Sequence, residues 1–213
     1  MEHVNIRFLE RSEYIKTRPL AELTFGNEDG FLDDYYADGG LISHGRIAVC
    51  EGCDADGESK IEDAADNGTD EGKYASDLEE YSCKDDADDF ENKRILSMVH
   101  IVPMLMTSTD GVTVPTSYIL CVATDPEHRH HGYMDTIFHM VLPILKEEGD
   151  AYAFLCPVNT AIYRHLGFTI DWTFDPIYTD LLLADDGLTI CSACLLNADA
   201  FSEPTRIEVK VDG

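Results

Sequence analysis

Two apolar runs separated by a short polar turn constrain the fold of this chain most strongly. Residues 95–106 (ILSMVHIVPMLM) and 117–124 (SYILCVAT) are rich in β-branched residues and have strand length. Between them stands Thr109-Asp110-Gly111, a sequence typical of a tight turn. The two runs therefore predict adjacent central strands joined as a hairpin.

An amphipathic helix is predicted soon after the second run. Between residues 133 and 148, apolar side chains recur every three or four positions and so share one helix face. Residues 151–155 then read as a buried strand, 159–165 as a short helix, and 169–178 as the start of another strand. This alternation predicts a mixed α/β sheet with helices on its faces.

The N-terminal region adds further elements to this pattern. Residues 4–9 alternate between apolar and polar and predict an opening strand. Residues 11–26 and 31–36 have helical spacing, and Gly39–Gly40 ends the second helix. Arg46 to Cys50 reads as a short strand. We therefore expect residues 1–178 to form the principal domain.

Two segments interrupt or follow that domain. Residues 51–92 consist mainly of Asp, Glu, Gly and Ser, and a segment this polar cannot bury enough surface to offset its ordering entropy. It is predicted to be a long acidic insertion, mostly disordered. Residues 179–213 are predicted to contribute strands that complete the sheet or pair with a second subunit in a homodimer. Their apolar runs are Leu181–Ala184, Leu188–Leu196 and Ile207–Val211.

The formal net charge of −27 limits the partners that this chain can attract. Such a surface repels phosphate backbones, which argues against nucleic acid and anionic membranes. It favours a cationic small molecule or peptide, although an acidic segment also serves solubility alone. No apolar run approaches the roughly 20 residues that span a bilayer, and no secretory signal pattern opens the sequence. We therefore expect a cytoplasmic protein.

The seven cysteines are odd in number and scattered, so they do not suggest a disulfide framework. Two CxxC pairs have the spacing of zinc ligands, Cys50 with Cys53 and Cys191 with Cys194. More than a hundred residues separate the pairs, and apolar neighbours surround the second one. Thiols packed as small apolar groups are therefore expected, with no metal. A metal-linked interaction module is the alternative.

The polar turn between the second run and the amphipathic helix carries the clearest functional signal. Residues 122–134 read VATDPEHRHHGYM. The N–H groups and the positive dipole end at a helix N-terminus form an anion site. Gly132 has no side chain to block close approach, and Arg129 adds a fixed positive charge. The segment therefore suits a pyrophosphate-bearing cofactor, although its spacing is neither that of a P-loop nor that of GxGxxG.

Two segments resemble motifs of the GNAT family of N-acetyltransferases. Residues 129–134 (RHHGYM) resemble the R/Q-x-x-G-x-G/A loop, with Met134 in place of a small residue. Residues 159–168 (NTAIYRHLGF) resemble the N-x-x-A-x-x-Y-x-x-x-G-F-type segment, with the tyrosine one residue earlier. Within the family, the sequence of these segments most resembles that of the N-terminal domain of Eis-type proteins. The resemblance implies a mixed, mostly antiparallel sheet of six to seven strands with about four helices.

The resemblance also implies a reaction. Acetyl-CoA would be the co-substrate, and a primary amine would attack it directly, without a covalent acyl-enzyme. Tyr163 would protonate the departing thiolate. A backbone N–H near Cys121 or Val122 would polarise the thioester carbonyl. The strand 119–124 would part from the strand that begins at Ala151 to admit the cofactor arm. The implied cofactor contacts are Cys121, Val122, Ala123, Thr124, Arg129, His130, His131, Gly132, Tyr133, Met134 and Asn159.

The acceptor amine is expected on the opposite side, next to aromatic residues of the two early helices. These are Phe25, Phe31, Tyr35 and Tyr36. The general base stays open among Glu22, Asp33, Asp34, His100 and water.

Simpler readings remain for each of these residues. Gly132 and Arg129 also fit an ordinary turn, Tyr163 fits a core aromatic, and His128, His130 and His131 are conceivable metal ligands. Met134 in the tight turn motivates one alternative function, a catalytically inactive acyl-CoA-binding regulatory domain.

Overall fold

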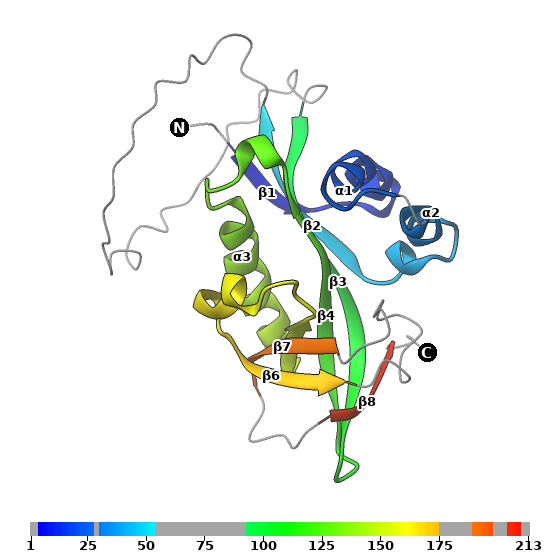
Figure 1. Cartoon of the computed structure of the whole chain (residues 1–213), viewed down its shortest axis with the longest axis vertical. Helices are drawn as coiled ribbons and strands as arrows, with labels where there is room; N and C mark the ends of the chain where they lie inside the picture. Colours follow the sequence, from blue (N-terminus) through cyan, green and yellow to red (C-terminus); the bar gives the residue numbers. More distant parts are fainter. Residues whose placement is uncertain (1–3, 28–29, 54–92, 175–188, 198–203, 210–213) are drawn as a thin grey trace, which may run out of the picture.

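One sheet of eight strands runs through the residues that the computed structural model describes, which are 4–27, 30–53, 93–174, 189–197 and 204–209. Seven strands follow the order β1-β2-β3-β4-β5-β7-β6, and β8 lies beside β3 (Figure 1). The only parallel pair among these strands is β4 with β5. The strands are β1 Val4–Phe8, β2 Arg46–Cys53, β3 Lys93–Ser108, β4 Thr113–Thr124, β5 Tyr152–Leu155, β6 Phe168–Phe174, β7 Thr189–Leu195 and β8 Pro204–Val209.

Helices cover both faces of this sheet. In Figure 1, α1 and α2 lie on one side of the central strands and α3 on the other. The α-helices are α1 Arg18–Phe25, α2 Phe31–Tyr36 and α3 Tyr133–Glu147. Short 3₁₀ helices precede or connect them: η1 Arg11–Thr17, η2 Leu41–Ser43, η4 Pro126–His128 and η5 Thr160–Leu166.

The architecture confirms the predicted mixed, mostly antiparallel α/β sheet. The apolar runs pair as the expected hairpin, β3 with β4, through a turn at residues 109–112. The sheet has one strand more than the six or seven expected, because β8 pairs with the far end of β3. The predicted insertion at 51–92 begins too early, because residues 51–53 belong to β2 and pair with β3. Its residues 54–92 and the predicted strand Leu181–Ala184 lie outside the described residues.

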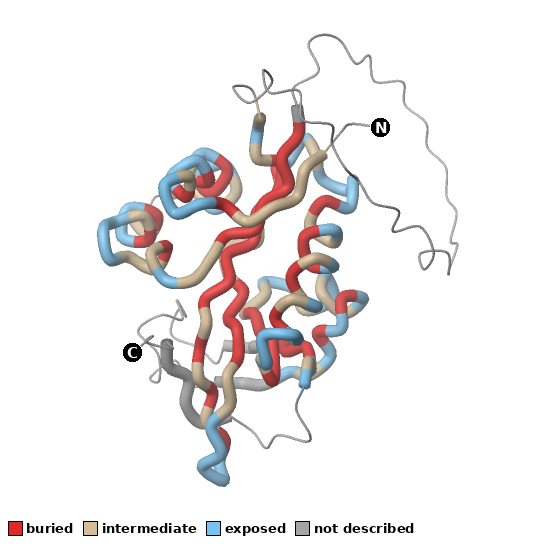
Figure 2. Tube along the Cα trace, turned by 180° about the vertical axis from the view of Figure 1, so that it is seen from behind, coloured by how far each residue is buried: buried red, intermediate tan, exposed pale blue. Residues whose placement is uncertain are grey.

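Alternation along the central strands explains why both faces need a cover. On β2, Ile47 and Val49 pack with α1 and α2, whereas Ala48 and Cys50 pack with α3. Successive strand residues point to opposite faces, so apolar residues at every position bury both faces of the sheet. Figure 2 shows the result, with the central strands buried along most of their length.

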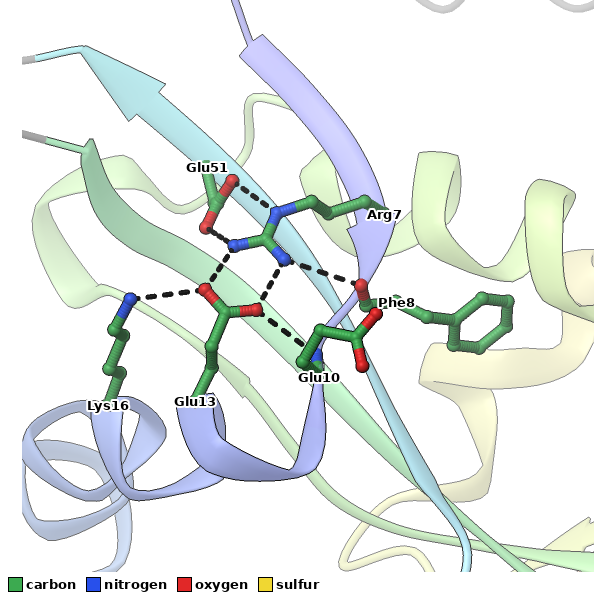
Figure 3. A network of polar contacts seen from close by, with 6 residues as sticks. All are labelled: Arg7, Phe8, Glu10, Glu13, Lys16 and Glu51. Atoms are coloured by element: carbon green, nitrogen blue, oxygen red, sulfur yellow. Dashed lines mark hydrogen bonds and ion pairs between the residues drawn. The ribbon is translucent and has the colours of Figure 1, made fainter. Parts of the chain in front are cut away.

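An ion-pair network attaches η1 to the edge of the sheet (Figure 3). Arg7 on β1 holds both oxygens of Glu51 on β2, at 2.8 and 2.9 Å, and both oxygens of Glu13, at 2.7 and 2.9 Å. Lys16 donates to Glu13 at 3.1 Å, and the Glu10 N–H does so at 3.0 Å. The Arg7 guanidinium holds the pKa of the Glu13 carboxyl well below its usual range. The network fixes where α1 starts relative to the sheet.

Within the described residues, no helix is both long and apolar enough to cross a membrane.

Candidate functional site

The parallel strands β4 and β5 separate before β4 ends. Their register runs from Thr116 opposite Tyr152 to Ile119 opposite Leu155 and stops there. On its other edge β4 stays paired with β3 as far as Thr124. The last five residues of β4 therefore have no strand partner on the β5 side, and their backbone lines the opening between the two strands.

A β-bulge lies within that unpaired stretch. Met98 pairs with Ala123 and His100 with Leu120, so Cys121 and Val122 together stand opposite the single residue Val99. Cys121 has a φ of 47°, in the left-handed region that residues with a Cβ rarely adopt. A bulge of this kind interrupts the ladder and turns backbone groups out of it. The interruption falls at the position from which the resemblance implies a donor to the thioester carbonyl.

The turn that follows β4 is built to bring backbone N–H groups to the start of α3. We call residues 125–132 the α3 loop. His130 and Gly132 both have positive φ, 67° and 77°. Gly132 is the N-cap of α3, and no side chain caps this helix. A Cβ added at Gly132 would meet no protein atom within 4 Å. The glycine is therefore favoured by its backbone conformation and not by packing within the chain.

Asp125 is a buried residue that holds the α3 loop in place. It is 1% exposed, and its Oδ1 accepts the Glu127 N–H at 2.9 Å. Its other carboxylate oxygen binds Arg94 at the start of β3, and its backbone N–H donates to Leu96 at 2.8 Å. The sequence analysis missed this role, although an Asp-Pro pair directly after a strand is a recognisable signal for a capped turn.

The side chains of the α3 loop present positive or titratable groups to solvent. Arg129, His130 and His131 are all exposed. Among the ion pairs of the described residues, none involves Arg129. In a chain with a net charge of −27, Arg129 gives this loop one exposed fixed cation beside uncapped helix N–H groups. Such a surface suits a phosphate-bearing ligand.

Tyr163 lies on the same face of the sheet as the α3 loop and α3. Its ring centroid is 5.9 Å from that of Phe138 and 6.0 Å from that of Phe168, and it packs on the core cluster that Val122 also contacts. Its hydroxyl makes no hydrogen bond to any described residue. Burial raises the pKa of the Tyr163 hydroxyl above its ordinary value. The group is therefore a protonated donor without an acceptor among the described residues.

Asn159 and Met134 have clear structural roles. The Asn159 side chain caps η5, with its Oδ1 accepting the Ala161 N–H at 3.0 Å, so its amide nitrogen is the part left for a ligand. Met134 is half-buried against the core cluster beneath α3. A hydrogen bond of 3.0 Å between His165 and Asp135 also joins η5 to the first turn of α3.

The four aromatic residues predicted for the acceptor side do not share one environment. Tyr35 is 2% exposed and belongs to the core, so the structure does not place it on an accessible wall. Phe31 and Tyr36 are half-buried, and Phe25 is 46% exposed at the end of α1. The Tyr36 hydroxyl lies 2.8 Å from that of Thr17. A six-residue helix turns one side inward, and that side holds Leu32 and Tyr35.

The candidate general bases also separate in the structure. His100 is 1% exposed, and both its ring nitrogens have partners within the protein. Burial lowers the pKa of His100 to about 4. Glu22 and Asp33 both bind Arg18, whereas Asp34 is exposed and takes part in no ion pair among the described residues. His100 is therefore a structural group and not a base.

One cysteine of each predicted CxxC pair, Cys50 and Cys194, packs as a small apolar residue. Cys50 and Cys194 are buried in the core cluster under α3, and burial raises the pKa of both thiols. In the part of the chain that the structure describes, no three His, Cys, Asp or Glu residues gather as a metal site.

A large cavity of about 710 Å³ lies away from the β4–β5 opening, between α1 and the ends of β1, β2 and β3. Leu20 and Leu23 of α1 form part of its wall, and the pair Arg94–Asp125 forms one edge. Three of its four cations bind carboxylates: Arg7 and Lys16 contact Glu13, and Arg94 contacts Asp125. The cavity is thus adjacent to the anchor of the α3 loop, and none of the described residues that line it belongs to β4 or β5.

Comparisons with known proteins agree with this geometry. A family model described as an acetyltransferase (GNAT) domain matches residues 87–170, which include β3, β4, the α3 loop, α3, β5 and η5. No curated protein matches the chain. Among solved structures, the GNAT family N-acetyltransferase YhbS from Escherichia coli, in complex with CoA, is 16% identical with a TM-score of 0.57. The comparison covers 99% of this chain and 91% of that one.

Two further solved structures share the fold. A GNAT family acetyltransferase from Brucella melitensis, in complex with acetyl-CoA, is 13% identical with a TM-score of 0.55, over 99% of this chain and 97% of that chain. Eis1 from Mycobacterium abscessus is 16% identical with a TM-score of 0.51, over 80% of this chain and 33% of that chain. The chain thus spans about a third of the length of several structures that it matches. Residues 87–170 of this chain thus match the acetyltransferase (GNAT) domain model, and the described residues share the fold of these solved structures.

Proposed function

We propose that the protein is an acetyl-CoA-dependent N-acetyltransferase that acetylates a primary amine. The observation that carries this proposal is the separation of β4 from β5 after the pair Ile119–Leu155, immediately before a loop with an exposed arginine and an uncapped helix. The opening offers unpaired β4 backbone to a chain-like ligand with amide groups. The α3 loop offers N–H groups and Arg129 to a pyrophosphate.

The cofactor contacts follow from that arrangement. The pantetheine arm would bind the β4 backbone at Val122 and Thr124, and the pyrophosphate would bind the backbone from Arg129 to Met134. The open space beside Gly132 supports this placement, since no protein atom lies within 4 Å of an added Cβ. The free amide of Asn159 would contact the arm from the η5 side.

Two groups of this chain would assist the transfer. An N–H of the bulge, at Cys121 or Val122, would stabilise the negative charge that develops on the thioester oxygen when the amine attacks. Tyr163 would donate its proton to the departing thiolate, because its hydroxyl is protonated and has no acceptor among the described residues. No cysteine is needed as a nucleophile.

The acceptor would approach from the face covered by α1 and α2, which is opposite to α3 (Figure 1). Phe25, Phe31 and Tyr36 are the members of the predicted aromatic set that keep exposed surface there. Asp34 would attract a cationic amine, and either Asp34 or water would remove its proton. The overall negative charge supports a cationic acceptor.

Calorimetric titration with acetyl-CoA tests the cofactor site, with CoA as a second ligand and ATP as a phosphate-bearing control. We expect micromolar affinity for both CoA species and much weaker binding of ATP. Gly132→Trp should abolish binding, because the new side chain fills the space that the α3 loop leaves open.

A screen of primary amines for release of free CoA then tests transfer. Binding without transfer to any amine would favour the inactive acyl-CoA-binding domain. No binding at millimolar acetyl-CoA would refute both readings.

A further inference from the structure

The cavity beside α1, which we call the α1 cavity, is apolar on one side and charged on the other. Its volume of about 710 Å³ lies within the range of pockets that bury small organic ligands. Leu23 of α1 follows Pro19 and Leu20 by four and three residues, so the three share one helix face and form most of the apolar side. Ile95 of β3 completes it. The Leu23 side chain is 57% exposed, so the described residues leave much of this apolar surface uncovered.

The charged side of the α1 cavity presents cations to solvent. Among the described residues, four cations and three carboxylates line the cavity, which leaves one net positive charge. The carboxylates of Glu13, Glu51 and Asp125 are only 19%, 6% and 2% exposed. The side chains of Lys16 and Arg94 are 62% and 42% exposed. The acids therefore lie beneath the cations, and a ligand that enters the cavity meets the cations first.

The two arginines of the α1 cavity differ in how much of their donor capacity the protein uses. Arg7 holds two carboxylates, Glu13 and Glu51, and a backbone carbonyl engages the last of its five N–H groups (Figure 3). Arg94 binds one carboxylate, that of Asp125, through a single nitrogen. Its side chain makes no other hydrogen bond to a described residue. Arg94 can therefore take a second carboxylate, as Arg7 does.

Lys16 supplies donors from a different element. Its ammonium has three N–H groups and uses one of them on Glu13, at 3.1 Å. Lys16 is mostly exposed, and exposed ion pairs of this kind contribute little to stability. Arg94 on β3 and Lys16 on η1 thus offer N–H groups to one anion in the α1 cavity.

We propose that the α1 cavity binds a monoanionic amphipathic ligand, a carboxylate that carries an apolar chain. Arg94 and Lys16 hold the carboxylate, and the chain lies against Leu20 and Leu23 of α1. One charge is preferred to two, because the three carboxylates beneath the cations repel a second negative charge. The site is separate from the proposed cofactor site and does not depend on the proposed acetyltransferase function.

Calorimetric titration with octanoate tests this site. Octanol and octyl phosphate serve as the neutral and the doubly charged probe of the same chain length, at about pH 8, where the phosphate carries nearly two charges. We expect the Kd of octanoate to be at least about tenfold lower than that of either control. Equal affinity for octanol would overturn the role of the cations, and tighter binding of octyl phosphate would overturn the preference for one charge.

Leu23→Asp and Ile15→Asp form a matched pair for the apolar side. Both wild-type side chains are 57% exposed, but only Leu23 lines the α1 cavity. We expect Leu23→Asp to raise the Kd of octanoate at least about tenfold, because it places a negative charge where the chain lies. Ile15→Asp should leave the Kd within about twofold of wild type. Both variants should fold, since exposed substitutions change stability little. Equal Kd values for the two variants would overturn the position of the chain.

Arg94→Gln should also raise the Kd of octanoate at least about tenfold, because it removes the main carboxylate ligand. Lys16→Gln covers the case in which Arg94→Gln does not fold, and we expect it to raise the Kd about fivefold. Lys146→Gln is the control for Lys16→Gln. It removes another exposed cation, on α3 at the opposite face of the sheet (Figure 1), and should leave the Kd unchanged. Equal Kd values for Lys16→Gln and Lys146→Gln would contradict the assigned carboxylate contacts.

Titration of octanoate with and without saturating acetyl-CoA separates the two proposed sites. We expect the same octanoate stoichiometry in both, since none of the described residues that line the α1 cavity belongs to β4, β5 or α3. A wild-type protein that binds octanoate but no acetyl-CoA would refute the proposed function and support this site. Displacement of octanoate by acetyl-CoA, or no binding of octanoate at millimolar concentration, would overturn it.

Discussion

At the scale of single residues, Tyr163 and His100 are both buried groups whose protonation state follows from where they lie. Tyr163 keeps a hydroxyl with no acceptor among the described residues, which suits a group that gives its proton away. His100 has two partners and a lowered pKa, which suits a group that never takes a proton up near neutral pH. Their neighbours, more than their residue types, distinguish the proposed proton donor from the structural histidine.

Tyr163→Phe should lower kcat about 100-fold, because the ring stays and only the acid is lost. Contacts with Phe138 and Phe168 do not need the hydroxyl, so the melting temperature and the Kd for acetyl-CoA should stay close to those of the wild type. Steady-state kinetics and calorimetry measure the two effects. Since burial raises the pKa of Tyr163, the wild-type kcat should decline only above about pH 10. An unchanged kcat in the variant would rule out the acid role.

His100 should make folding sensitive to mild acid. Its folded pKa of about 4 lies below the ordinary histidine value of about 6.5, so the unfolded chain takes up a proton first as the pH falls. The contribution is fully present above about pH 6.5 and is lost between there and about pH 4, by about 3 kcal/mol. Urea unfolding at several pH values should show a steeper decline for wild type than for His100→Gln. Parallel curves for the two proteins would refute the assignment.

At the scale of elements, the α3 loop depends on a carboxylate that no ligand needs to touch. Asp125→Ala should destabilise the protein by about 2 kcal/mol, since it leaves the Glu127 N–H and the Arg94 guanidinium without their buried acceptor. It should also weaken acetyl-CoA binding, because the N–H groups of the loop are no longer held in register. Denaturant unfolding and calorimetry measure both. The exposed neighbour supplies the control, and Glu127→Ala should change neither value appreciably. Equal effects of the two variants would remove the anchoring role.

Local pattern was sufficient to predict most elements but not the contacts between them. The period of the apolar residues predicted α3, and the paired runs predicted β3 and β4. The bulge at Cys121 could not be read from SYILCVAT, because it depends on a register with β3 that is set by distant residues. Tyr35 and Tyr36 likewise look equivalent in FLDDYY, and only the position of His100 across the sheet decides which one is buried. The opening between β4 and β5 was expected from the family resemblance alone.

At the scale of the whole molecule, the acidic segment can be separated from the fold. The two residues that flank it, Cys53 and Lys93, are partners across β2 and β3, so the ends to be joined already lie side by side. Deleting residues 54–89 leaves a three-residue connection, a common hairpin length. It removes 15 acidic and 3 basic side chains and changes the formal charge from −27 to −15. We expect the melting temperature to stay within about 4 °C of wild type in calorimetric scans. A much larger loss would mean that the segment supports the fold.

The strand β8 covers part of one edge of β3, a role that neither the site nor the core requires. β2 and β8 lie end to end along one edge of β3, with β2 paired to residues 93–101 and β8 to residues 104–108. Without β8, the outer half of β3 would offer a row of unsatisfied N–H and C=O groups, a ready template for a strand from another copy. A chain lacking residues 204–209 should therefore self-associate as its concentration rises, even while the proposed acetyltransferase site stays intact. We therefore expect β8 to protect this edge of β3 from pairing with a strand of another copy.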